Sequence, residues 1–115
     1  MGISTHILDT ALGRPAANVP VRLWEFRDHP AGGAWHEVGS ANTDNDGRCK
    51  TLLGSHVLIA ADYKLTFEVG VYFHDLRIAT LYPRIEIAFT VADPSQHYHI
   101  PLLLTANGYT TYRGS

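Results

Sequence analysis

The stretch Tyr63-Lys64-Leu65-Thr66-Phe67-Glu68-Val69 decides the fold class, because its side chains alternate between apolar and polar. Successive side chains of a β-strand point to opposite faces. One face of this stretch therefore carries Tyr, Leu, Phe and Val, and the other carries Lys, Thr and Glu. We predict a strand over residues 63–69 with the apolar side chains on one face and the polar ones on the other.

The same period of two recurs on both sides of this stretch. It predicts strands at residues 3–8, 19–26, 35–43, 84–91, 98–102 and 109–113. Turn-forming residues separate these segments, as in Gly13-Arg14-Pro15, Asp44-Asn45-Asp46-Gly47 and Asp93-Pro94-Ser95. Residues 71–78 space their apolar side chains as a helix does, so we expect one short helix there. Seven or eight short strands with one helix predict an all-β fold, a two-sheet antiparallel β-sandwich.

Length and composition limit the function classes. The chain has 115 residues, enough for one domain over residues 1–115 but not for two cores. Nine Lys and Arg against 11 Asp and Glu give a formal net charge of -2, so there is no basic field to hold a nucleic acid. The chain has neither a run of ~18 apolar residues nor the features of a signal peptide. We expect a cytoplasmic protein that binds neither nucleic acid nor membrane.

The chain contains a single cysteine, Cys49. One cysteine excludes an intramolecular disulfide and a Cys-rich zinc finger. We expect Cys49 to be an unreactive thiol in the core or in a loop.

Histidine is frequent, with seven residues, and two of them, His97 and His99, lie two positions apart. In a strand both imidazoles share one face, while the apolar residues between and after them take the other. Pro101 cannot donate a ladder hydrogen bond. The strand is therefore expected to be an edge strand, or to have an unpaired outward position at Pro101.

Three uses of this histidine pair are open on the residues alone. Both rings could be structural or idle surface histidines. They could hold zinc with a third ligand such as His6. They could also perform acid–base catalysis, because imidazole titrates near neutral pH and a nearby arginine can hold an oxyanion. A Ser-His-Asp nucleophile has no support, since no Gly-x-Ser-x-Gly elbow occurs.

Both ends of the chain carry specific motifs. They are Ser4-Thr5-His6-Ile7-Leu8-Asp9-Thr10 near the N-terminus, and His97-Tyr98-His99-Ile100-Pro101-Leu102-Leu103-Leu104 and Tyr112-Arg113-Gly114-Ser115 near the C-terminus. Together with the Asp46-Gly47-Arg48 turn, they resemble the 5-hydroxyisourate hydrolases, the transthyretin-related enzymes, over essentially the whole chain. The closing Tyr-Arg-Gly-Ser separates these hydrolases from true transthyretins, the thyroid-hormone carriers of the same fold.

The resemblance implies an activity, a site and an assembly. The activity is hydrolysis of 5-hydroxyisourate to 2-oxo-4-hydroxy-4-carboxy-5-ureidoimidazoline in urate breakdown, by attack of water on the lactam carbonyl. Matching motifs assign catalysis to His6, Arg48, His99 and Ser115, and substrate binding to His6, Arg48 and Tyr112. The family implies a homotetramer, a dimer of dimers with active sites at the dimer–dimer interface, and neither metal nor organic cofactor. Which imidazole acts as the base stays open.

Two other classes of function are alternatives. The first is a transthyretin-like binding or transport protein that holds a small ligand in its central channel, and its mark would be a channel without His6, Arg48 and His99. The second is an immunoglobulin-like interaction module. It would account for the strands but not for the histidine pair or the terminal tetrapeptide.

Overall fold

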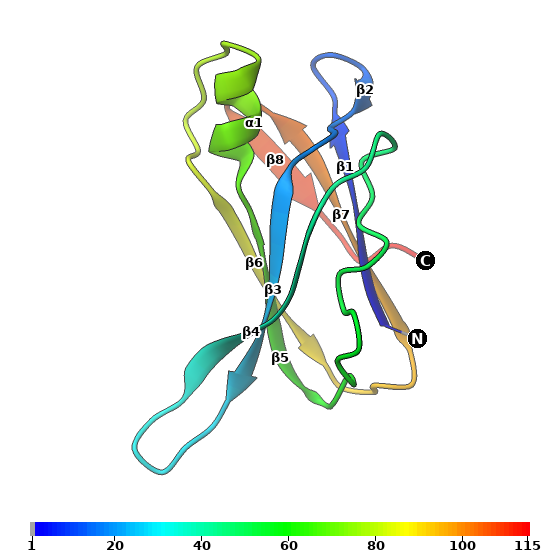
Figure 1. Cartoon of the computed structure of the whole chain (residues 1–115), viewed down its shortest axis with the longest axis vertical. Coiled ribbons are helices and arrows are strands. Elements are labelled where there is room, and N and C mark those ends of the chain that lie inside the picture. Colours follow the sequence, from blue (N-terminus) through cyan, green and yellow to red (C-terminus); the bar gives the residue numbers. More distant parts are fainter. Residues whose placement is uncertain (1) are drawn as a thin grey trace.

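The chain forms two four-stranded sheets and one short helix in the computed structural model, which describes residues 2–115 (Figure 1). The elements are β1 (Gly2–Asp9), β2 (Arg14–Pro15), β3 (Pro20–Arg27), β4 (Ala34–Asn42), β5 (Ala61–Phe67), α1 (Val69–Asp75), β6 (Ile85–Val91), β7 (His97–Thr105) and β8 (Gly108–Thr111). Each strand predicted from the alternation is present, with its bounds shifted by three residues at most. The all-β sandwich is therefore confirmed.

One strand pair departs from the predicted antiparallel arrangement. The first sheet has the order β2-β1-β7-β8 and the second has the order β4-β3-β5-β6. β1 and β7 run parallel, in register from Gly2↔His97 to Asp9↔Leu104, whereas the other strand pairs among residues 2–115 are antiparallel. Side-chain alternation fixes the two faces of a strand but not the direction of its neighbour, so the sequence pattern could not reveal this pair.

The short strand β2 lies where the sequence predicted only a turn. It pairs with the last two residues of β1, and Arg14 lies opposite Asp9. The buried carboxylate of Asp9 accepts the N–H groups of Ala11 and Leu12 at 3.1 and 2.9 Å, which folds the chain back on itself. A strand of two residues is too short to show any periodicity.

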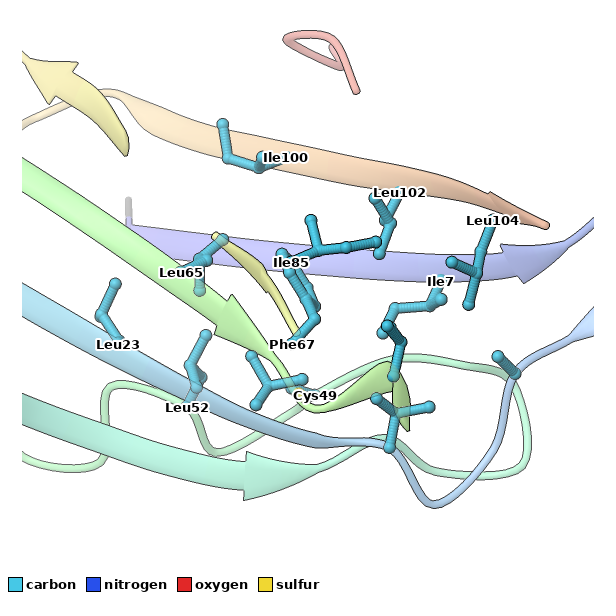
Figure 2. Packing of buried hydrophobic residues seen from close by; sticks show 14 of the residues in the cluster. Ile7, Leu23, Cys49, Leu52, Leu65, Phe67, Ile85, Ile100, Leu102 and Leu104 are labelled. Carbon is cyan, nitrogen blue, oxygen red and sulfur yellow. The ribbon is translucent and has the colours of Figure 1, made fainter. Parts of the chain in front are cut away.

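The core lies between the two sheets. Figure 2 shows Ile7, Leu102 and Leu104 of the first sheet facing Leu65 and Phe67 of the second. All five side chains are fully buried. Burial of one such side chain stabilises the fold by roughly 1.5–3 kcal/mol. The apolar faces predicted for these strands are the ones that the fold buries.

The helix α1 begins two residues before the predicted segment 71–78 and ends three residues before its end. It packs on one end of the sandwich and buries Val69, Tyr72 and Phe73 (Figure 1). It ends at Asp75 because Arg77 adopts a left-handed conformation with φ 58°. The apolar residue Ile78, which the spacing included, lies beyond that end.

The outward face of the first sheet carries the candidate residues. Ile7 of β1 and Tyr98 of β7 point into the core, so the residues of opposite parity point outward. On β1 these include Ser4 and His6, and on β7 they include the histidine pair. The expected shared face of the two imidazoles is confirmed.

Pro101 does not lie on an edge strand, so that alternative was wrong. β7 lies between β1 and β8. Its ladder with β8 begins one residue after the proline, at Leu102↔Thr111, and the carbonyl of Pro101 accepts the hydroxyl of Thr111 at 2.8 Å. The proline therefore lies just outside the ladder, at a position where no N–H is required.

Candidate active site

The parallel pairing of β1 with β7 brings the two end motifs of the chain together. In this register Ser4 lies opposite His99, and His6 lies opposite Pro101. The hydroxyl of Ser4 is 2.7 Å from Nδ1 of His99 and 2.7 Å from Nε2 of His97. Residues that are more than 90 positions apart in the sequence therefore share one polar cluster on the outward face.

Arg48 reaches the same place from a tight turn. The carboxylate of Asp44 accepts the N–H of Asp46 at 2.9 Å and that of Arg48 at 3.0 Å. Hydrogen bonding from the N–H of Arg48 is the main reason why the pKa of Asp44 lies below its ordinary value. The backbone of Arg48 then forms an isolated antiparallel bridge with His6. The turn thus holds the guanidinium-bearing residue beside β1.

Gly47 makes this close approach possible. It adopts φ 77°, and its carbonyl accepts the N–H of Ile7 at 2.8 Å. A side chain at Gly47 would collide with the carbonyl oxygen of Ile7. Only glycine combines the left-handed backbone with the missing Cβ that this contact requires.

The C-terminal tail lies against His99. The N–H of Gly114 donates to the carbonyl of His99 at 2.8 Å, and the two residues form an isolated bridge. Ser115 follows directly and is exposed. The tail therefore ends beside the imidazole, although Ser115 itself was predicted as catalytic only from the resemblance.

The electrostatic surroundings keep His99 neutral. Burial is the main cause that lowers its pKa, and Arg48, His6 and His97 lower it further through like-charge repulsion. The backbone bridge between His6 and Arg48 and the register of β1 with β7 bring these residues into one cluster with His99. An uncharged imidazole beside a permanent cation is a suitable arrangement for a general base next to an oxyanion-stabilising group.

Tyr112 lies apart from this cluster. It is 54% exposed and lines a depression of about 240 Å³ with Ile87, Phe89 and Ile100, at the open edge between β6 and β8. The guanidinium of Arg113 lies 4.5 Å from the centre of the Tyr98 ring. The structure thus places Tyr112 at the sheet edge rather than against the histidines.

A larger depression, of about 520 Å³, adjoins the cluster. Ser4, Arg48 and His97 line one side of it, and residues 50–54 line another. The depression is open to solvent and offers hydrogen-bonding groups and two cationic side chains, those of Arg48 and Lys50, so it could receive a polar heterocycle.

Sequence reasoning missed Ser4 as a site residue. Its spacing could have indicated it, because Ser4 lies two positions before His6 and therefore on the same face of the strand. Its contact with the histidine pair depends on the parallel pairing of β1 with β7, which no local pattern reveals.

Cys49 lies next to Arg48 but turns into the core. Its side chain is buried, and burial, with Asp44 nearby, raises the pKa of the thiol to about 11. The thiol stays protonated near neutral pH and is not an activated nucleophile.

Within residues 2–115, no group of three His, Cys, Asp or Glu side chains is arranged to hold a metal ion. In the same part of the chain, no helix is long and apolar enough to cross a membrane.

The chain resembles proteins named as 5-hydroxyisourate hydrolases over nearly its whole length. The 5-hydroxyisourate hydrolase of Halalkalibacterium halodurans is 42% identical over 120 residues, which cover 98% of this chain and 97% of the relative. The solved structure of Klebsiella pneumoniae 5-hydroxyisourate hydrolase superimposes with a TM-score of 0.80 at 32% identity, covering 98% of this chain and 92% of that one.

The fold is also that of transthyretin. Transthyretin from Sparus aurata superimposes with a TM-score of 0.87 at 24% identity, covering 97% of this chain and 95% of that one. This likeness concerns the fold alone. Residues 3–114 match the model of the HIUase/Transthyretin family, and the chain therefore belongs to that family.

Proposed function

We propose that this protein hydrolyses 5-hydroxyisourate to 2-oxo-4-hydroxy-4-carboxy-5-ureidoimidazoline in urate breakdown. The observation that carries the proposal is that His6, Arg48 and His99 meet on one outward face. Arg48, at the end of the 44–48 turn, forms a backbone bridge with His6 of β1, and His99 lies on the neighbouring strand β7. The relatives named for this activity match nearly the whole chain.

The reaction needs a base and a partner for developing negative charge. Water attacks the lactam carbonyl, an imidazole takes one proton from the water, and the electron pair of the carbonyl moves onto its oxygen. Arg48 stabilises that oxyanion or holds the polar edge of the purine with its fixed, forked charge. Collapse of the tetrahedral intermediate breaks the C–N bond, the protonated imidazole returns the proton to the leaving nitrogen, and a carboxylic acid remains.

His6 and His99 are the two candidate bases. His99 is half-buried and has a lowered pKa, so it stays neutral beside Arg48. His6 lies on the same face of the first sheet, and we propose that it helps to hold the substrate. No step of this scheme requires a metal ion or a covalent intermediate.

Ser115 and Tyr112 extend the proposed site. Ser115 follows Gly114, whose backbone contacts His99, so its hydroxyl can orient the water or the base. Tyr112 is exposed at the open sheet edge, and we propose that it contacts the substrate only in the assembled oligomer.

The proposed assembly is a homotetramer, a dimer of dimers. The candidate site lies on an outward sheet face, and a second subunit covering that face would exclude bulk water from the reaction. The mass of the purified protein in solution tests this assembly. A cytoplasmic location and a single domain over residues 1–115 remain predictions, to be checked by cell fractionation and by limited proteolysis.

A transthyretin-like carrier is the alternative from another class. Its expected mark was the lack of His6, Arg48 and His99, and all three residues are present and gathered in one place. This observation favours the hydrolase.

The direct test is an ultraviolet assay with freshly generated 5-hydroxyisourate, compared with its uncatalysed decay. We expect faster decay that survives treatment with a chelator and dialysis. Decay at the uncatalysed rate would contradict the proposal. Activity that is lost on chelation and restored by zinc would contradict the metal-free scheme and revive the zinc site of His6, His97 and His99.

A further inference from the structure

Ser4 lies between two imidazoles. Its hydroxyl oxygen is 2.7 Å from Nε2 of His97 and 2.7 Å from Nδ1 of His99. The parallel register explains this position, because Ser4 pairs with His99 and the preceding outward residue of β1, Gly2, pairs with His97. Both distances lie at the short end of the range for hydrogen bonds to a hydroxyl.

A hydroxyl carries one hydrogen, so it donates to one ring and accepts from the other. The two rings must therefore present opposite groups to Ser4, an N–H on one side and a bare nitrogen on the other. Which ring carries the N–H decides the tautomer of both neutral imidazoles.

The contact also decides which nitrogen of His99 can react. Nδ1 faces Ser4, so only Nε2 is available to a water molecule or a substrate. Nε2 can accept a proton only if it is bare, which requires the ring's hydrogen to sit on Nδ1. The hydroxyl must then accept from His99 and donate to His97.

We propose that Ser4 is a positioning residue that holds His99 as the Nδ1–H tautomer, donates its own hydrogen to Nε2 of His97, and so makes His99 the general base. This inference rests on the proposed hydrolysis. When Nε2 of His99 takes the proton from water, Nδ1–H continues to donate to Ser4, so no hydrogen bond has to reverse. His97 acts on the base indirectly, because it accepts the hydrogen of the Ser4 hydroxyl and so fixes the direction of that hydroxyl.

The charges around His99 agree with a neutral ring, which the proposed base requires. Arg48 comes from the 44–48 turn and His6 from β1, and burial together with these groups lowers the pKa of His99. The ring is therefore neutral near pH 7, as a base must be. A neutral ring with the opposite tautomer would present Nε2–H to the water and could not take its proton.

The test combines spectra and kinetics on the full-length protein. In ¹H–¹⁵N correlation spectra of histidine-labelled protein, we expect His99 to carry hydrogen on Nδ1, with Nε2 bare. Ser4→Ala should lose this preference and lower kcat on the order of tenfold to a hundredfold, with KM nearly unchanged. Ser4→Thr, which keeps the hydroxyl, should restore both.

Two further variants separate positioning from folding. Ser40→Ala removes an exposed hydroxyl from a strand of the other sheet and should leave kcat unchanged. His97→Ala should lower kcat as Ser4→Ala does, and the double variant should be no slower than Ser4→Ala alone, because both changes break the same chain of hydrogen bonds.

The outcomes distinguish this inference from the proposed function. A wild-type protein without hydrolase activity overturns the proposed function, and with it the role of Ser4. An active wild type in which His99 carries hydrogen on Nε2, or in which Ser4→Ala keeps full kcat, overturns the role of Ser4 alone.

Discussion

The backbone of Gly114 lies directly against the imidazole of His99. Its N–H donates to the His99 carbonyl at 2.8 Å, and a methyl group in place of its hydrogen would lie 2.5 Å from Cδ2 of that ring. Real Cβ atoms do not approach so closely, so either the ring or the tail would have to move. The contact fixes the candidate base and the end of the chain relative to each other.

Gly114→Ala should therefore lower activity without unfolding the protein. A shift of about 1 Å at a catalytic group can cost on the order of a hundredfold in rate. The tail is largely exposed, so the melting temperature should change little. Gly108→Ala is the matched control, because the nearest neighbour of its added methyl, Oγ1 of Thr105, would be at an ordinary 3.5 Å. Equal activity of both variants would show that the contact with His99 has no role.

Gly47→Ala should reduce both stability and activity. The substitution strains a left-handed residue and pushes its side chain into the carbonyl of Ile7, which displaces Arg48. We expect a loss of about 1–3 kcal/mol in the free energy of unfolding. Gly13→Ala tests the backbone strain alone, since Gly13 has φ 68° but no atom within 4 Å of the added methyl. Equal losses in the two denaturant titrations would argue against the collision.

The pH dependence of the rate should reflect the lowered pKa of His99. Burial and the neighbouring Arg48, His6 and His97 disfavour the imidazolium, so the neutral base persists to lower pH than for a free histidine. The acid limb of kcat/KM should therefore lie below the ordinary histidine value of about 6.5. NMR titration of His99 should give the same midpoint. A limb well above that value would exclude His99 as the titrating base.

A second histidine, His56, has a structural role outside the cluster of His6, Arg48 and His99. Nε2 of His56 lies 2.8 Å from the buried carboxylate of Glu25. That carboxylate also accepts hydrogen bonds from the hydroxyl of Tyr63 at 2.7 Å and from Nε of Arg27 at 2.9 Å. Burial alone would raise the pKa of Glu25, but the hydrogen bonds from Tyr63, Arg27 and His56 outweigh burial and lower it. Burial, with Glu25 adjacent, raises the pKa of Tyr63 to about 12, so the phenol remains a donor.

His56→Ala should destabilise the fold by about 1–3 kcal/mol at neutral pH, because it leaves a buried carboxylate with one donor fewer. A lowered carboxyl pKa stabilises the folded state above the ordinary pKa, and this stabilisation is lost as the pH falls through the lowered value. The difference from wild type should therefore shrink in acid. His36→Ala, at an exposed position of β4, should match wild type throughout. A constant difference across the pH range would mean that Glu25 is not involved.

The sequence predicted the faces of the strands better than their partners. The alternation at residues 63–69 and around His99 placed the apolar side chains in the core correctly, because burial acts on each strand separately. The parallel pairing of β1 with β7 joins segments more than 90 residues apart. Ser4 could not be placed without that register.

In the candidate site, too, the local sequence predicted some features, whereas contacts between distant segments or subunits decided others. The sequence placed Arg48 at the end of a tight turn, because the Asp, Asn and Gly residues of that turn can be recognised from the local sequence. Tyr112 was grouped with the histidines through the family motif, yet in the single chain it lies at the β6–β8 edge. Its proposed contact with substrate depends on neighbouring subunits, which one chain does not contain.

The decay of freshly generated 5-hydroxyisourate, followed by ultraviolet absorbance, tests the central claim most directly when four proteins are compared. Wild type and His36→Ala should accelerate the decay equally. His99→Ala and Arg48→Ala should each lose roughly a hundredfold or more in rate while keeping the wild-type melting temperature. Wild-type rates in His99→Ala and Arg48→Ala, or equal losses in all three variants, would contradict the assignment of this cluster as the active site.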